Sequence, residues 1–407
     1  MSAGNTAPIG HGRQESEMQT ATRRSLLLSA LAAAAVASPA KKYRVAVIGH
    51  TGRGNYGHGI DTVWNAFSQM EVVGVADPDE KGRAGALART RAKRSYADYR
   101  EMLRREKPDL VGIGPRWMDQ RVDMVTAAAE TGAHIYMEKP FAQSLAEADR
   151  MVEVVRKNQV KLQLAHQMRT SPYTLRAKTI VDAGEIGVIQ EARVRGKEDQ
   201  RAGGEDMMVL GSHLCDMLRY FLGNPMWVTA HVTHDGAEIG GGDVRQATEP
   251  IGPIAGNQVS AMFAYPAGVH AFFASRASDQ TDPLRFGTWL YGSKGVLFLP
   301  NAIYPGGGLF VLRSPAWLPD AKRQWEPIEA KPDLAGQGID RRAEHEIANA
   351  LMVADLVRAI ERDGKPCCNE EDGRWTIEMV HSIYQAQKTG DRVKLPLLDR
   401  THPLAKL

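Results

Sequence analysis

Residues 45–54, VAVIGHTGRG, decide the fold, because four apolar residues run directly into a turn that holds three glycines. Such a run is typical of a buried strand that leads through a glycine-rich turn into a helix, whose first backbone amides bind a pyrophosphate. The usual pattern is Gly-x-Gly-x-x-Gly; Gly49 and Gly54 fit its first and third positions, and Thr51 stands at the second. A glycine-rich loop that binds no nucleotide is the alternative interpretation. The residues predicted at the cofactor are Gly49, Thr51, Gly52, Arg53 and Gly54.

Asp77 stands directly after the next apolar run, Val72–Ala76. A carboxylate there accepts hydrogen bonds from ribose hydroxyls and repels a 2′-phosphate, so the sequence favours NAD without excluding NADP. Asp77 lies 28 positions after Gly49 (77 − 49), more than the usual ~20, so residues 55–60 are expected to loop out. Alternatively, Asp77 is a turn carboxylate beside Pro78.

Strand-like and helical patterns alternate from residue 42 onward. The strand-like runs are Tyr43–Ile48, Val72–Ala76, Leu110–Ile113, Ile135–Met137 and Lys161–Ala165. Helical spacing fills the gaps, as in Leu145–Lys157 behind the cap-like Ser144. This alternation predicts an α/β fold, with a Rossmann-type, doubly wound parallel sheet over residues 41–165 that binds a dinucleotide.

Residues 166–407 show a different rhythm, in which strand-like runs follow one another without helices between them. The runs are Ile189–Val194, Trp227–Val232, Gln258–Phe263, Val269–Phe273, Phe286–Tyr291 and Val296–Leu299. They predict an α+β domain with a large, mostly antiparallel sheet. Residues 235–256 are expected to form a long surface loop. Helical patterns at 343–360 and 375–387 are expected to pack back toward the first domain.

The composition is that of a globular protein with a small-molecule partner. Hydrophobic residues make up 43% of the 407 and charged residues 24%, which excludes fibrous and disordered classes. The 51 Lys and Arg against 48 Asp and Glu leave a net charge of +3, too small to indicate nucleic acid or a membrane surface as partner. The three cysteines, Cys215, Cys367 and Cys368, do not suggest a disulfide framework.

Residues 1–40 resemble an export signal of the twin-arginine type. Arg23 and Arg24 precede the apolar run 26–37, which ends in a small-x-small pattern and is too short for a permanent membrane anchor. The mature protein is therefore expected to be periplasmic or otherwise exported through the twin-arginine pathway. An alanine-rich surface helix is the alternative interpretation.

Glu138-Lys139-Pro140 follows the run Ile135–Met137, at the sheet edge where open α/β folds bind ligands. Together with the turn at Gly49, this tripeptide resembles the signature of the Gfo/Idh/MocA family of NAD(P)-dependent oxidoreductases, named for glucose-fructose oxidoreductase and inositol dehydrogenase. Other family-like segments extend the resemblance from residue 42 to about 397: GEIG at 184–187, RAGG at 201–204, GSH at 211–213 with Asp216, GSKG at 292–295, GDRV at 390–393 and LPL at 395–397.

The resemblance implies a lysine that contacts both the nicotinamide ribose and the substrate, and a histidine that acts as acid or base on the substrate hydroxyl. Lys139 and His213 occupy these positions. Oxidation of a secondary alcohol needs a hydride acceptor and a base, and a histidine kept neutral by a nearby ammonium suits the second task. The implied activity is NAD(P)-dependent oxidation of a secondary hydroxyl of a sugar, polyol or glycoside. For His213 alone, a hydrogen-bonded helix histidine is the alternative.

One departure from the family pattern affects the catalytic set. Many relatives carry an aspartate four residues before the histidine, where this chain has Val209. Asp206 returns to nearly the same helical face two turns before His213, and Glu205 lies beside it, so either carboxylate is a candidate replacement. Alternatively, both residues begin a helix, where acidic side chains are favourable.

The remaining site predictions concern residues that follow predicted strands or share the His213 segment. Expected at the cofactor, besides Lys139, are Pro115, Arg116, Trp117, Glu138 and His166. Expected at the substrate, besides Lys139, are His166, Arg169 and Asp216, since sugars need polar groups that fix their orientation. For Asp216, a structural helix carboxylate is an equal alternative.

No metal site is predicted, because His231 and His234 are expected on opposite sides of a strand and the cysteines are distant. Two rival functions stay open. One is an NAD-dependent glycoside hydrolase that works by transient oxidation, elimination, water addition and reduction. The other is a non-catalytic sugar- or dinucleotide-binding protein. A homo-oligomer is expected, because relatives assemble through the open sheet face of the second domain.

Overall fold

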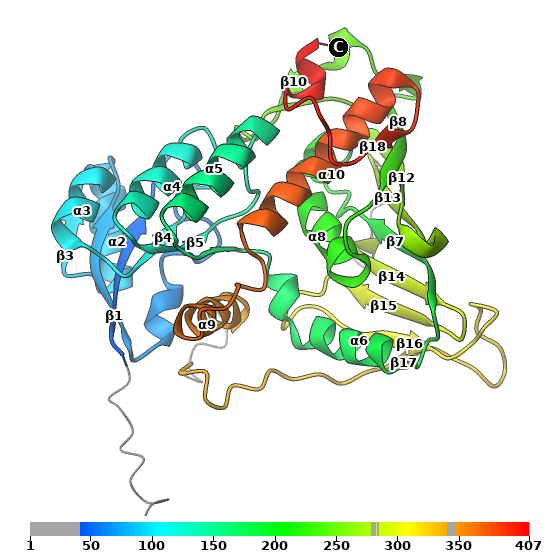
Figure 1. Cartoon of the computed structure of the whole chain (residues 1–407), viewed down its shortest axis with the longest axis horizontal. Helices are drawn as coiled ribbons and strands as arrows, with labels where there is room; N and C mark the ends of the chain where they lie inside the picture. Colours follow the sequence, from blue (N-terminus) through cyan, green and yellow to red (C-terminus); the bar gives the residue numbers. More distant parts are fainter. Residues whose placement is uncertain (1–40, 278–281, 283–284, 340–346, 407) are drawn as a thin grey trace, which may run out of the picture. The chain divides into compact units, whose positions relative to one another are not determined.

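The structure, a computed structural model, describes residues 41–277, 282, 285–339 and 347–406 (Figure 1). Residues from Tyr43 onward belong to one unit. The predicted export signal, residues 1–40, lies outside the described residues. The domain boundary predicted at residues 165 and 166 falls inside this unit and stays a prediction. Within the described ranges, no helix combines the length and the apolar character needed to cross a membrane.

The first sheet has six parallel strands in the order β3-β2-β1-β4-β5-β6. This is the order of Rossmann-type folds, so the predicted doubly wound sheet is confirmed. Val45, Val47 and Ile48 in the central strand are fully buried, because other elements cover both faces of that strand. The strands are β1 (Tyr43–Ile48), β2 (Met70–Ala76), β3 (Arg94–Tyr96), β4 (Leu110–Ile113), β5 (His134–Met137) and β6 (Leu162–Leu164).

Helices connect these strands from β2 onward. The helix predicted at residues 145–157 is confirmed at both ends. Its cap residue Ser144 accepts a hydrogen bond from the Glu147 N–H at 3.2 Å, and Ala148 and Met151 are buried on one face. The helices are α2 (Glu80–Thr90), α3 (Tyr99–Glu106), α4 (Arg121–Glu130) and α5 (Leu145–Lys157).

The helix predicted directly after the glycine-rich turn is wrong. Residues 51–62 form turns and one isolated bridge, and the next helical element is the 3-10 helix η1 (Val63–Ala66). The φ angles of four glycines in this stretch lie between 67° and 82°, whereas an α-helix needs a negative φ at every position. The chain therefore crosses from β1 to β2 through a series of turns. The four glycines are Gly52, Gly54, Gly57 and Gly59.

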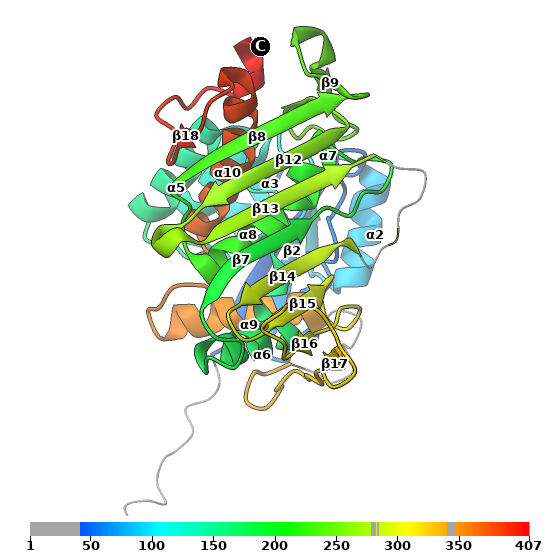
Figure 2. The same ribbon diagram turned by 90° about the vertical axis from the view of Figure 1, so that its right-hand side faces the viewer.

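The second sheet is mostly antiparallel, as predicted, and within the described residues only β7 and β13 pair in parallel. Figure 2 views this sheet face-on, with α7, α8 and α10 behind it. Its order is β17-β16-β15-β14-β7-β13-β12-β8-β18, with β9 paired to β8. The strands are β7 (Ile189–Arg195), β8 (Trp227–His234), β9 (Ala237–Glu238), β12 (Gln258–Ala264), β13 (His270–Arg276), β14 (Gly287–Gly292), β15 (Val296–Pro300), β16 (Phe310–Leu312), β17 (Glu326–Pro327) and β18 (Val393–Lys394).

The helices of this part pack against both sheets. Helix α9 contacts η1, η2 and strand β6. Helix α10 contacts strand β6 of the first sheet and strand β8 of the second, and it also contacts helices α5 and α8. The helix predicted at residues 343–360 begins with residues 343–346, which lie outside the described residues. The elements are η2 (Gln167–Thr170), α6 (Pro172–Asp182), α7 (Gly204–Val209), α8 (Gly211–Leu222), α9 (Ile347–Glu361) and α10 (Glu370–Thr389).

Asn349 of α9 ties three segments together through one side-chain amide. Its Nδ2 donates to the carbonyl of His58 at 2.6 Å. Its Oδ1 accepts from the Tyr136 hydroxyl at 2.6 Å and from Nε2 of Gln167 at 2.8 Å. Helix α9 is thereby fixed to the loop after β1, to β5 and to η2, which all adjoin the predicted site.

Candidate active site

The loops that follow β4 and β5 are held by one buried side chain, Arg121 at the start of α4. Its Nη1 donates to the carbonyls of Glu138, at 2.6 Å, and of Pro140, and its Nη2 donates to the carbonyl of Pro115. Burial lowers the pKa of Arg121 to about 10. The role of Arg121 was not predicted from the sequence, because an arginine in the first turn of a helix carries no motif.

Glu138 stabilises the same loop. Its carboxylate is fully buried and accepts hydrogen bonds from the Lys139 N–H at 3.0 Å and from the His58 N–H at 2.8 Å, while Nδ1 of His58 lies 3.0 Å away. Burial raises its pKa, but the hydrogen bonds and charge of His58 and the charge of Lys139 outweigh burial and bring the pKa to about 2. The cofactor contact of Glu138 stays a prediction.

Lys139 reaches from the first sheet to the junction of two helices. Its Nζ donates to the carbonyl of Val209 at 3.2 Å, and its side chain is buried. Val209 ends α7 and α8 begins at Gly211, so the ammonium lies beside a backbone carbonyl one helical turn before His213. Burial lowers the pKa of Lys139. The partner of the Lys139 ammonium is thus a backbone oxygen rather than a carboxylate.

Two imidazoles lie side by side next to this junction. The ring centroids of His166 and His213 are 4.8 Å apart, and both residues are buried. Burial lowers the pKa of His213 well below its usual value, and the charges of His166 and Lys139 lower it further. His213 is therefore neutral near pH 7 and able to accept a proton. Nδ1 of His213 and Nε2 of His166 have no hydrogen-bond partner among the described residues.

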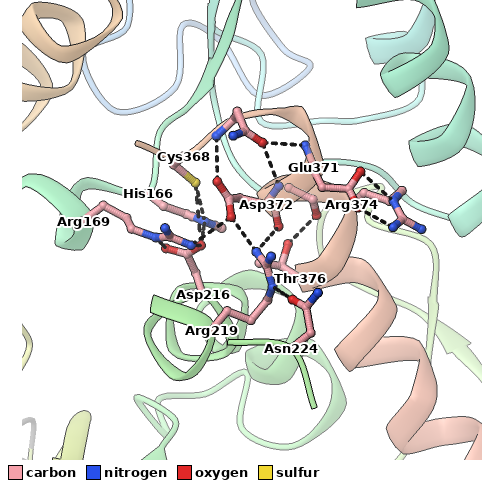
Figure 3. Close-up of polar contacts among 12 residues, drawn as sticks. His166, Arg169, Asp216, Arg219, Asn224, Cys368, Glu371, Asp372, Arg374 and Thr376 are labelled. Carbon is pink, nitrogen blue, oxygen red and sulfur yellow. Dashed lines mark hydrogen bonds and ion pairs between the residues drawn. The ribbon is translucent and has the colours of Figure 1, made fainter. Parts of the chain in front are cut away.

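Arg169 and Asp216 are paired with each other (Figure 3). Arg169 donates to both carboxylate oxygens of Asp216, from Nε at 2.8 Å and from Nη2 at 2.7 Å, and its Nη1 donates to the carbonyl of Cys367 at 3.0 Å. Asp216 is fully buried, and although burial raises its pKa, the Arg169 charge holds that pKa well below the usual range. The substrate contacts of Arg169 and Asp216 stay predictions.

Neither carboxylate proposed to replace the missing aspartate reaches Lys139 or His213. Asp206 accepts from the Ser275 hydroxyl at 2.6 Å and from the Glu198 N–H at 3.1 Å. Glu205 accepts from the backbone N–H of Thr248 at 3.2 Å and from its hydroxyl. Both residues lie in the first turn of α7, which agrees with the alternative that they begin a helix. The predicted catalytic roles of Asp206 and Glu205 are therefore corrected.

The predicted surface loop at residues 235–256 returns to the site. It contains the short strands β10 (Arg245–Gln246) and β11 (Pro253–Ile254), and Glu249 pairs with Nη2 of Arg116 at 3.0 Å. The charges of Glu249 and Arg116 both act on Lys139. Glu249 was not predicted from the sequence, because a glycine-rich segment gives no signal of where it packs. Arg116, which was expected at the nicotinamide, is held by this ion pair with Glu249.

The glycine-rich turn is packed against its own chain. A Cβ at Gly49 would lie 2.1 Å from the Tyr56 ring, and one at Gly54 would lie 2.4 Å from the backbone N of Arg116. The guanidinium of Arg53 lies 5.2 Å from the centre of the Trp117 ring and also pairs with Asp119. Gly52 N–H donates to Oδ1 of Asn55 at 3.0 Å. These glycines are needed for close approach of the chain to itself.

A cavity of about 170 Å³ opens at the carboxyl ends of β1 and β2, where the sequence analysis placed the cofactor. Its lining includes Gly49 and Asp77. Asp77 accepts from the Thr51 hydroxyl at 2.7 Å, from the Thr51 N–H at 3.0 Å and from the Asp79 N–H at 2.9 Å. A ribose hydroxyl therefore has to compete with Thr51 for this carboxylate. The cavity is smaller than the ~300–1,000 Å³ typical of ligand pockets, so it fits part of a dinucleotide.

These features define a class of protein. A dinucleotide-dependent oxidoreductase combines a parallel sheet in Rossmann order, a cavity at the carboxyl edge of that sheet, and a buried lysine that approaches a neutral histidine.

Sequence comparison gives the family. Residues 43–166 match the oxidoreductase family with an NAD-binding Rossmann fold, and residues 174–298 match the GFO/IDH/MocA C-terminal domain. The two matches cover more than half of the chain, which belongs to the Gfo/Idh/MocA family.

Individual relatives are distant. The dehydrogenase aclE of Aspergillus oryzae is 27% identical over 180 residues, 40% of this chain and 49% of that protein. This chain thus spans about half the length of that relative. The D-apiose dehydrogenase of Paraburkholderia graminis is 24% identical over 360 residues, 84% of this chain and 87% of that protein. A levoglucosan dehydrogenase in complex with NADH and levoglucosan shares the fold, with a TM-score of 0.68 and 18% identity over 88% of this chain and 100% of that chain.

Replacement of Arg121 by lysine tests the role of its guanidinium. Arg121 donates from two separate nitrogens, whereas the donors of a lysine ammonium all sit on one atom, so Arg121→Lys is expected to lower the free energy of unfolding by roughly 2–4 kcal/mol. Urea-induced unfolding followed by circular dichroism measures the change. Arg100→Lys is the control, because Arg100 is exposed and its nearest carboxylate is 3.7 Å away. Equal stability of the two variants would contradict the proposed role of Arg121.

Proposed function

We propose that this protein oxidises a secondary hydroxyl of a sugar, polyol or glycoside and uses NAD as the hydride acceptor. The observation that carries the proposal is the approach of Lys139 to the helix junction that leads into His213, whose pKa is lowered. The names of relatives support the substrate class, since D-apiose and levoglucosan are carbohydrates.

The residues present fit a dinucleotide. The cavity lined by Gly49 and Asp77 lies where Rossmann folds hold the adenosine half, and Lys139 lies at the carboxyl end of β5. When bound, NAD supplies the hydride acceptor. A buried carboxylate at Asp77 disfavours a 2′-phosphate, which supports NAD over NADP.

His213 and Lys139 divide the proton chemistry between them. Neutral His213 accepts the hydroxyl proton at an imidazole nitrogen. The Lys139 ammonium uses one hydrogen on the Val209 carbonyl, so the others can bind the oxygen that becomes a carbonyl. Burial of both groups excludes water from the reacting atoms.

A second function uses the same site for glycoside cleavage through transient oxidation. The pair of adjacent imidazoles favours it, because elimination of an aglycone and addition of water each need a proton donor or acceptor beyond the first base. In this cycle the cofactor is reduced and reoxidised in turn, so glycosides are consumed without net NADH.

Replacement of Lys139 tests both enzymatic functions. Lys139→Met is expected to lower kcat at least 100-fold while NADH binding persists, because the ammonium acts on the reacting oxygen. Absorbance of NADH is followed with NAD or NADP and a panel of free sugars, and release of the aglycone is followed with glycosides. Lys178→Met is the control, since Lys178 pairs only with Asp182 on the exposed side of α6.

The outcomes separate the functions. Net NADH from free sugars supports the dehydrogenase, and aglycone release without net NADH supports the glycosidase. Unchanged turnover in the Lys139→Met variant would refute both the dehydrogenase and the glycosidase function. A wild-type protein that binds sugar and NADH without any turnover would instead support the non-catalytic binding protein.

We further propose export through the twin-arginine pathway, supported by Arg23 and Arg24 before the apolar run 26–37. In a bacterial host with this pathway, the wild-type protein is expected in the periplasmic fraction. Replacement of both arginines by lysine is expected to retain it in the cytoplasm, because the receptor reads the arginine pair. Immunoblots of cell fractions measure the distribution, and export of the double variant at the wild-type level would contradict the proposal.

Assembly into a homo-oligomer through the second sheet is also a proposal. Cross-strand neighbours form a partly exposed row of Met262, Phe272, Arg193, Trp289 and Phe298 on one face of this sheet. Phe272→Glu is expected to lower the molar mass measured by light scattering to that of one chain. Leu175→Glu on α6, outside the sheet, is expected to leave it unchanged. A monomeric wild-type protein would overturn the proposal.

A further inference from the structure

Three side chains with different donor atoms converge at His166 (Figure 3). His166 follows β6, Asp216 lies in α8, and Cys368 directly precedes the start of α10. All three are fully buried. Cys368 lies 202 residues after His166, so only the fold brings them together.

The three donor atoms lie almost equally far from one another. Sγ of Cys368 lies 3.6 Å from Nδ1 of His166 and 3.7 Å from Oδ1 of Asp216, within hydrogen-bond range for sulfur, and Nδ1 of His166 lies 3.7 Å from the same Oδ1. A nitrogen–oxygen separation of 3.7 Å is too long for a hydrogen bond, and the single thiol hydrogen can serve only one acceptor. The thiol therefore bonds to one of its two neighbours at a time, and these neighbours do not bond to each other.

A cation fits the space between them. A point equally distant from the corners of a triangle with sides of 3.6, 3.7 and 3.7 Å lies about 2.1 Å from each corner. Zinc binds nitrogen at ~2.0–2.1 Å, carboxylate oxygen at ~2.0–2.2 Å and thiolate sulfur at ~2.3 Å. A water at the ~2.8 Å of a hydrogen bond does not fit at this point. We propose that His166, Asp216 and Cys368 bind a divalent transition-metal cation, with Zn²⁺ as the best match.

The donor set selects among cations. Sulfur and nitrogen donors suit Zn²⁺ and its neighbours in the first transition row, whereas Mg²⁺ and Ca²⁺ prefer oxygen ligands alone. The prediction from sequence that no metal binds rested on His231 and His234 and on the distance between cysteines along the chain. The fold removes that last argument, because Cys368 contacts His166 and Asp216 directly.

Surrounding residues hold the cluster in place. Arg169 donates hydrogen bonds to both oxygens of Asp216 and also donates to Asp372 at 3.3 Å. Arg219 donates to the same Asp372 carboxylate at 2.7 Å. Such outer contacts orient metal ligands in proteins. Each carboxylate oxygen has two lone pairs, so Oδ1 of Asp216 can accept from Arg169 and still bind a cation.

The ligands offset the charge of a bound cation. Cys368 loses its thiol proton to solvent, and the thiolate and the Asp216 carboxylate together carry two negative charges against a divalent ion. Asp372 pairs with both Arg169 and Arg219, so it offsets one of their two positive charges. Three protein ligands leave a coordination position for water or another ligand. Through His166 the cluster borders His213, so the cation would adjoin the candidate active site.

Metal binding can be tested without any measurement of activity. The purified protein is freed of metal with a chelator, dialysed and titrated with Zn²⁺ against a chromophoric competitor, with Mg²⁺ titrated in parallel. One high-affinity Zn²⁺ per chain and no Mg²⁺ binding are expected. Titration with Co²⁺ is expected to give a near-ultraviolet band from thiolate-to-cobalt charge transfer, which reports the sulfur ligand in the wild-type protein.

Two cysteine variants locate the site. Cys368→Ser is expected to abolish the charge-transfer band and to weaken Zn²⁺ binding at least 100-fold. Cys367→Ser is the matched control, because the neighbouring thiol contacts Gln163 rather than the cluster. Circular dichroism checks that both variants fold. If one variant does not fold, the cobalt spectrum of the wild-type protein still tests the proposal. Absence of the band in the wild-type protein, or equal Zn²⁺ affinity of the two variants, would overturn the proposal and leave the proposed hydride transfer unaffected.

Discussion

One buried guanidinium, that of Arg121, holds together the two loops on which the site depends. A charge taken out of water costs several kcal/mol unless its donors are bonded, and Arg121 meets this requirement with carbonyls that would otherwise be unpaired in the interior. Those carbonyls belong to Pro115, Glu138 and Pro140, so the same hydrogen bonds set the direction in which Lys139 leaves β5. Lys139 can then cross to the Val209 carbonyl and join the two sheets at the site.

Features encoded by neighbouring residues were predictable from the sequence. The bounds of β1 and α5 agree with the expected Tyr43–Ile48 and Leu145–Lys157, because apolar periodicity and the Ser144 cap are local signals. Lys139 lies at the carboxyl end of β5, because the end of a strand is visible in the sequence. The helix predicted after Gly54 does not form, for a physical reason. A glycine pattern does not reveal whether φ is positive, and here four glycines with positive φ prevent a helix.

The partners of buried charges were not predictable, because they come from distant parts of the chain. Asp206 lies on the expected helix but bonds to Ser275, 69 residues later, instead of Lys139. Glu205 bonds to Thr248, and Arg169 to Asp216, for the same reason. Sequence spacing shows which helix face a carboxylate occupies, whereas its function depends on what packs against that face.

Hydrogen-bonding capacity that the protein leaves unused indicates where a ligand belongs. A buried polar atom without a partner costs about 1–3 kcal/mol, so such atoms persist mainly where something else completes them. Near the site, the Glu138 carboxylate accepts from backbone N–H groups and Arg169 donates to Asp216 and to a backbone carbonyl, whereas Nδ1 of His213 and Nε2 of His166 are unpartnered within the described residues. Lys139 retains donor hydrogens beyond the one given to Val209. A hydroxyl group both donates and accepts, so adjacent hydroxyls of a carbohydrate match an acceptor imidazole beside a donor ammonium.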